Sequence, residues 1–117
     1  MWYHPSGLKV YLGLGATDMR KSIDGLSILV SNHLQEDPFS GHLYVFCNRR
    51  RTILKLLYWD SNGFCLWHKR LEKHHFRWPD EAGDVKEISS RELEWLIAGL
   101  DIYQVDAHEG LCYSSVY

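Results

Sequence analysis

The feature that most constrains the fold is a pair of apolar runs joined by a tight turn. The run TILKLLYWD, residues 52–60, is almost continuously apolar, which is typical of a strand buried on both faces of a sheet. Asn62 and Gly63 follow it, and both residue types tolerate the positive φ angles of a two-residue hairpin turn. The run FCLWHKRLE, residues 64–72, then returns. The chain is therefore expected to fold around an antiparallel hairpin whose first strand is central.

Further strands are expected on either side of this hairpin. Short segments rich in β-branched and aromatic residues, bounded by Gly, Pro or Asn, are typical of strands. Three such segments are LKVYLG at residues 8–13, HLYVFCN at 42–48 and HHFRWP at 74–79, the last a short strand or edge segment closed by Pro79. The sheet is then expected to be an antiparallel meander of about four to five strands.

Two helices complete the predicted fold. Apolar residues spaced by three or four positions predict a helix over residues 16–34, with Thr17 or Asp18 as its N-cap. Ser89 and Glu92 fit a capping box at the start of a second helix, over about residues 91–101. The predicted class is α+β, an antiparallel β-meander packed with an N-terminal helix and a C-terminal helix.

The length of 117 residues fits a single domain with one hydrophobic core. Residues 1–100 are expected to form this domain, and residues 101–117 a loosely ordered tail without a clear period. No apolar run approaches the roughly 20 residues that span a bilayer, and the N-terminus lacks the pattern of a secretory signal. Cys47, Cys65 and Cys112 form no CxxC pair, which favours a reduced, cytoplasmic protein.

The net charge of −2 conceals a strong asymmetry along the chain. Residues 45–78 contain eight Lys or Arg against two acids, a net charge of +6. Residues 79–117 contain two basic residues against nine acids, a net charge of −7. A basic segment of this kind indicates an anionic partner, and an acidic one indicates a solvated surface or a basic partner.

The basic segment is the first candidate site, because gathered Lys and Arg side chains bind phosphates by releasing counterions. Its candidate DNA-binding residues are Arg49, Arg50, Arg51, Lys55, Lys69, Arg70, Lys73 and Arg77. Interleaved aromatic rings could stack on bases if exposed, although on half-buried strands such rings belong to the core. The alternative for the charges is a solvated face without a partner.

Neither a metal site nor a catalytic site is expected. His68, His74 and His75, with Cys65 and Glu72 nearby, are possible zinc ligands, but their spacing matches no familiar tetrahedral pattern. The acids Asp18, Asp24, Asp60 and Glu72 could suggest a two-metal site, but Asp18 is expected to be a cap, Asp60 to bond the backbone of the turn and Glu72 to pair with a cation. No Ser-His-Asp or Cys-His relay is visible. We therefore expect no cofactor and no enzymatic activity.

Two stretches together carry a resemblance to a known family. They are GATDMRKSIDGL at residues 15–26, and DPFSGHLYVFCNRRRTILKLLYWDSNGFCLWHKRLEKHHFRWP at residues 37–79. In this order and spacing the chain resembles the TnpB accessory proteins of IS66-class bacterial insertion sequences, over residues 7 to about 100. The resemblance implies a non-catalytic protein encoded beside a larger transposase, and a role in transposition.

The TDMRK element within the first stretch provides a second candidate site, formed by Asp18, Arg20 and Lys21. Cations in the first turn of a helix oppose its dipole, which invites either an internal carboxylate or an external phosphate as partner. The alternative is structural, with Asp18 as a cap and Arg20 paired to an acid.

The combined hypothesis is an accessory protein that contacts the DNA backbone of transposon ends in a complex with the transposase. The competing hypothesis is an adaptor that docks on the transposase without touching DNA. In that case the acidic segment from Asp80 would contact the basic partner.

Overall fold

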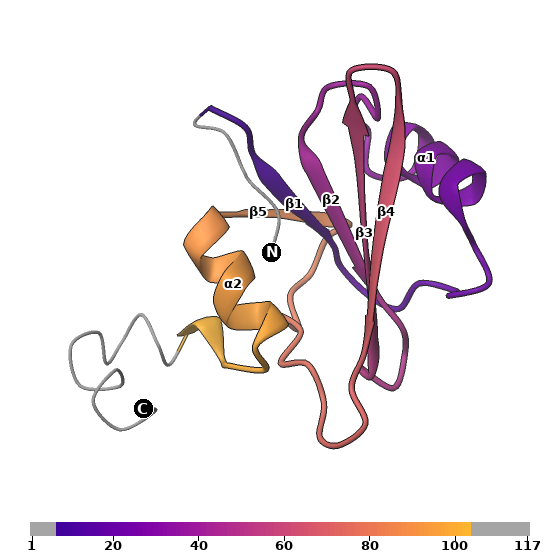
Figure 1. Ribbon diagram of the computed structural model, residues 1–117. Helices are drawn as coiled ribbons and strands as arrows, with labels where there is room; N and C mark the ends of the chain where they lie inside the picture. Colours follow the sequence, from indigo (N-terminus) through magenta and orange to yellow (C-terminus); the bar gives the residue numbers. More distant parts are fainter. Residues whose placement is uncertain (1–6, 104–117) are drawn as a thin grey trace.

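The computed structural model describes residues 7–103 and contains one five-stranded sheet and two helices (Figure 1). In chain order the elements are β1 (Val10–Gly13), α1 (Ile23–Asn32), β2 (Leu43–Cys47), β3 (Ile53–Asp60), β4 (Gly63–Arg70), β5 (Val85–Ile88) and α2 (Ser90–Ile97). The α+β class is therefore confirmed. Neither α1 nor α2 is long and apolar enough to cross a membrane.

The strands lie side by side in the order β4-β3-β2-β1-β5. Strands β2, β3 and β4 form the predicted antiparallel meander, with Tyr58 opposite Cys65 across the β3–β4 hairpin. The prediction is wrong at β1, which pairs in parallel with β2. Because parallel neighbours need a long crossover, α1 carries the chain back from the end of β1 to the start of β2.

Two segments differ from the strand predictions. Residues 74–79 form no strand: His74 has a φ of 68°, in the left-handed region, and after it Phe76 and Trp78 turn into the core, where they are only 2% and 8% exposed. Strand β5, which was not predicted, pairs antiparallel with β1 at the edge of the sheet. Its sequence VKEI is short and half charged, so it carries little strand signal of its own.

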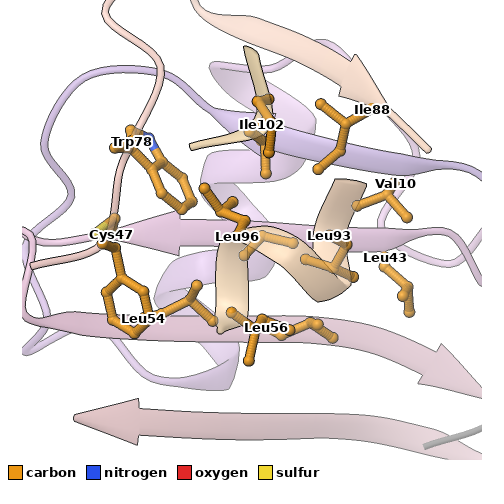
Figure 2. Close-up of a cluster of buried hydrophobic side chains, with 14 residues drawn as sticks. Val10, Leu43, Cys47, Leu54, Leu56, Trp78, Ile88, Leu93, Leu96 and Ile102 are labelled. Carbon is orange, nitrogen blue, oxygen red and sulfur yellow. The ribbon is translucent and has the colours of Figure 1, made fainter. Parts of the chain in front are cut away.

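The two helices cover opposite faces of the sheet, because successive side chains of a strand point to opposite sides. On one face Leu26 and Val30 of α1 pack with Tyr44, Phe46 and Leu57. On the other face Leu93, Leu96 and Ile97 of α2 pack in one cluster with strand residues such as Val10, Leu43 and Leu56 (Figure 2).

Helix α2 begins at the predicted capping box. The Ser89 side chain accepts from the Glu92 backbone N–H at 3.1 Å, and the Glu92 carboxylate accepts from the Ser89 N–H at 2.9 Å. After this helix Ile102 enters the core beside Trp78. The rest of the segment expected to be a tail, residues 104–117 with Cys112, lies outside the described residues. Within the described residues Cys47 and Cys65 are free thiols.

Candidate nucleic-acid interface

Three connections of the chain meet at one end of the sheet, which lies at the bottom of Figure 1. Strands β1, β2 and β4 end there, and β3 and β5 begin there. The connecting segments are 14–22, 48–52 and 71–84. Residues from separate parts of the basic segment are therefore brought to a common end of the sheet.

The turn between β2 and β3 presents two arginines to solvent. Its shape is held by the Asn48 side chain, whose oxygen accepts from the N–H groups of Thr52 at 2.8 Å and Ile53 at 3.0 Å. Arg51 closes the turn with a φ of 61°, and its N–H donates to the Asn48 carbonyl. Arg49 and Arg50 occupy the tip of this fixed turn, and both are exposed.

The segment after β4, residues 71–78, lies along this turn and is called the strap. Its Leu71 N–H donates to the Thr52 carbonyl at 2.8 Å, and its Phe76 N–H donates to the Arg51 carbonyl at 2.7 Å. His75 Nδ1 lies 2.8 Å from the Arg50 carbonyl oxygen. The strap is therefore fixed against the arginine turn by backbone contacts.

The anchoring of the strap determines which of its side chains are exposed. Because Phe76 and Trp78 point into the core, Lys73 and Arg77 remain in solvent. A shallow groove of about 370 Å³, open to solvent, separates these cations from the end of α2; its lining includes His74, His75 and Gly99. We call Arg49, Arg50, Lys73 and Arg77 the basic end.

None of the four side chains of the basic end forms a hydrogen bond or ion pair within residues 7–103. The nearest acid in sequence is Glu72, and its carboxylate is bound to the Arg70 guanidinium at 3.0 Å. Within the described residues, therefore, no carboxylate pairs with the four cations of the basic end.

The third arginine of the turn has a structural role. The Arg51 guanidinium donates to the carbonyls of Gly15 at 2.9 Å and Asn48 at 3.2 Å. It also lies 6.0 Å from the centre of the Trp78 ring. Arg51 thus joins the turn to the 14–22 connection and to the strap, and it is only half-exposed.

Two of the lysines predicted to bind DNA form hydrogen bonds within the fold. Lys55 is 9% exposed on the α1 face, where its ammonium group donates to the Met19 carbonyl at 2.9 Å and the Lys21 carbonyl at 3.0 Å. Lys69 lies on the α2 face and donates to the Ile97 carbonyl, the last of α2, at 3.0 Å. Lys69 is near the end of β4, but because both ammonium groups are bound within the fold, Lys55 and Lys69 are not included in the basic end.

The second candidate site, Asp18, Arg20 and Lys21, lies in the 14–22 connection. The Asp18 carboxylate accepts from the Arg20 backbone N–H at 2.9 Å and binds its guanidinium at 2.7 Å. The Arg20 side chain, and then its backbone N–H, lower the pKa of Asp18 to about 2. The charge of Arg20 is thus balanced locally, although its side chain is exposed.

Helix α1 starts later than predicted, at Ile23 after Ser22. The predicted cap at Thr17 or Asp18 is therefore wrong, because Ser22 occupies the N-cap position and its side chain makes no capping bond. The segment before the helix is held by the Asp18–Arg20 pair and by Lys55, which donates to the carbonyls of Met19 and Lys21. Arg20 and Lys21 therefore precede the helix and do not lie in its first turn.

No group of three His, Cys, Asp or Glu side chains within residues 7–103 is placed to hold a metal ion. Of the histidines considered as ligands, His75 contacts the Arg50 carbonyl, while His68 lies on β4 beside Arg70. A turn was predicted at Asn48, but not that its side chain would hold the turn, although Asn side chains commonly bond the backbone of a turn.

A family model and two relatives match most of this chain. The family model described as IS66 Orf2 like protein matches residues 8–107. A protein named "Uncharacterized protein y4hO", from Sinorhizobium fredii (strain NBRC 101917 / NGR234), is 37% identical over 99 residues, which cover 83% of this chain and 86% of the relative. A second protein of that strain, "Uncharacterized protein y4jC", is 35% identical over 95 residues, 81% of each chain. No solved structure matches the chain. The chain belongs to the family of IS66 Orf2-like proteins.

Proposed function

We propose that this protein is a non-catalytic accessory factor in transposition of an insertion sequence, and that its basic end holds the phosphate backbone of DNA. Membership of the IS66 Orf2-like family supports the accessory role. The observation that supports the DNA contact is the gathering of Arg49, Arg50, Lys73 and Arg77 at one end of the sheet, exposed and without acidic partners among residues 7–103.

The chemistry of this surface suits phosphates. Guanidinium groups bind phosphate oxygens through two parallel N–H donors, and an ammonium group adds a mobile point charge. The Asn48 turn and the anchored strap hold the backbones of these cations in place, so little main-chain order is lost on binding. Each neutralised phosphate also releases condensed counterions, which is the main source of affinity.

The form of DNA that fits is the duplex. Proteins that bind single strands stack bases on exposed aromatic rings. At the basic end the aromatic rings of the strap, Phe76 and Trp78, are buried in the core. The described part of the surface therefore offers charge without a stacking platform, which favours a duplex backbone such as the transposon ends.

The competing adaptor hypothesis used the acidic segment from Asp80 as a contact for a basic transposase. Several of these acids have partners within the fold, at 3.0, 3.3 and 4.0 Å: Glu81 with Lys86, Asp84 with His33, and Glu87 with Lys9. Because these acids already pair within the fold, the segment is a weaker candidate for docking a basic transposase.

The test is a gel shift with the purified protein on two duplexes, one with the sequence of the element end and one of random sequence. The wild-type protein is expected to bind duplex, with unlabelled single strands competing poorly. Arg49→Ala with Arg50→Ala is expected to weaken binding about 10- to 100-fold near 0.1 M salt, because each lost phosphate contact removes its counterion release.

The matched control is Lys9→Ala with Arg91→Ala, which removes the same charge near the opposite end of the sheet. This control is expected to retain affinity. Equal losses in both double variants would show that only net charge matters, and no binding by the wild type would reject direct DNA contact.

A further inference from the structure

Three aromatic rings gather at the end of the sheet opposite the basic end. Trp59 and Phe64 face each other across the β3–β4 hairpin, with ring centres 5.1 Å apart. The Phe39 ring, from the loop before β2, lies 5.1 Å from Trp59 and 5.3 Å from Phe64. We call Phe39, Trp59 and Phe64 the aromatic surface.

Phe39 is held in an exposed position by its own loop. Its N–H donates to the Asp37 carboxylate at 2.9 Å, and the Asp37 carbonyl accepts from the Tyr44 hydroxyl at 2.8 Å and from the Ser40 N–H at 3.1 Å. The loop is thus tied to the buried ring of Tyr44, yet Phe39 remains 59% exposed. Exposed aromatic residues on a fixed backbone are typical anchors of protein interfaces.

The charge around the aromatic surface is negative. Asp37 lies two residues before Phe39. Asp60 follows Trp59 at the end of β3 but lies on the opposite face of the strand, on the side of Tyr58. Within the described part of the chain neither carboxylate forms an ion pair. The nearby Lys9 faces Glu87 at 4.0 Å. A negative rim repels a phosphate backbone, so nucleic acid is a poor occupant for these rings.

We propose that the aromatic surface docks a protein segment that has an apolar anchor flanked by lysine or arginine. The anchor packs against the exposed ring of Phe39, and a flanking cation meets the carboxylate of Asp37. This protein-binding site goes beyond the DNA contact proposed above, and it depends on that proposal only for the choice of the transposase as probe.

The two surfaces lie at opposite ends of β3. Ile53 begins the strand beside the arginine turn and Asp60 ends it beside Trp59, seven residue steps of about 3.3 Å, or roughly 23 Å, apart. A protein segment on the aromatic surface therefore leaves the basic end open, and DNA and protein bind together.

The test is an array of overlapping peptides that covers the transposase encoded by the same element, probed with labelled full-length protein. Bound peptides are expected to combine an apolar residue with flanking Lys or Arg, and to lose at least tenfold in signal with Phe39→Ala. Asp37→Asn keeps a side-chain oxygen that can accept from the Phe39 N–H but removes the charge, so it is expected to weaken the same peptides several-fold, more at low salt than at high salt.

The matched control is Ile28→Ala, since Ile28 is 57% exposed on α1, away from the aromatic surface. It is expected to bind the array as the wild type does. Absence of any bound peptide, binding of acidic peptides, or binding unaffected by Phe39→Ala would overturn the proposal.

Sedimentation of the same variants distinguishes a second copy of this chain as the occupant. A wild-type dimer that Phe39→Ala converts to monomer would also overturn the proposal. In every variant of the aromatic surface the duplex affinity is expected to stay unchanged, so failure of this site and failure of the DNA contact give different results.

Discussion

Lys55 and Lys73 carry the same charge but occupy different environments. Lys55 is buried and donates to two backbone carbonyls, while Lys73 is exposed on the strap without a partner in the described chain. A buried ammonium group with carbonyl partners stabilises the fold, whereas an exposed one is available to a ligand. Counting charges in the sequence cannot separate these two roles.

This difference predicts opposite effects of the same substitution. Lys55→Met leaves the carbonyls of Met19 and Lys21 without a donor, so it is expected to lower the free energy of unfolding by about 1–3 kcal/mol. Duplex affinity of the folded variant is expected to stay near that of the wild type. Urea denaturation and fluorescence anisotropy measure the two quantities.

Lys73→Met is the matched control, with stability unchanged and duplex affinity reduced about tenfold near 0.1 M salt, as for one lost phosphate contact. If Lys55→Met reduced affinity without reducing stability, the structural role assigned to Lys55 would be wrong.

Among the elements, the strap depends on two buried rings for its position. Phe76 is 2% exposed and its N–H donates to the Arg51 carbonyl, while the Trp78 indole N–H donates to the Gly13 carbonyl at 3.1 Å. The strap has no regular secondary structure, so these contacts hold it in place of the backbone hydrogen bonds of a strand pair.

Phe76→Ala is therefore expected to destabilise the protein by about 3–5 kcal/mol, the usual range for removing a buried phenyl ring. Hydrogen exchange is expected to accelerate first at the Leu71 and Phe76 amides. Arg77→Ala, next to it but exposed, serves as control and is expected to change stability by less than about 0.5 kcal/mol. Equal stability of both variants would contradict the anchoring of the strap.

The elements that could be predicted were those whose signals are local. The Asn-Gly pair at residues 62 and 63 identified the β3–β4 hairpin, although the two turn residues are Ser61 and Asn62 and Gly63 begins β4. Ser89 with Glu92 identified the start of α2. Strand β5 and the parallel pairing of β1 with β2 depend on partners far along the chain, so no local pattern carried them. The same limit explains the strap, since its aromatic residues resemble a strand until the core that receives them is known.

For the whole molecule, the sequence predicted the net charge of the candidate site but not which of its side chains form one surface. The sequence located the eight cations, yet contacts such as Lys69 with the Ile97 carbonyl, 28 residues away, decide which remain available. The fold leaves four of them together at one end and places three aromatic rings with acids at the other. This polarity matches a protein that joins DNA to a second protein.

The central claim is that the four cations of the basic end form a single phosphate-binding surface. The most direct test is the salt dependence of duplex affinity, measured by fluorescence anisotropy for the wild type and for a variant with Arg49, Arg50, Lys73 and Arg77 all changed to Ala. The slope of log affinity against log salt is expected to fall in magnitude by about 3.6, since each phosphate contact contributes about 0.9. A folded variant with the slope of the wild type would contradict the claim.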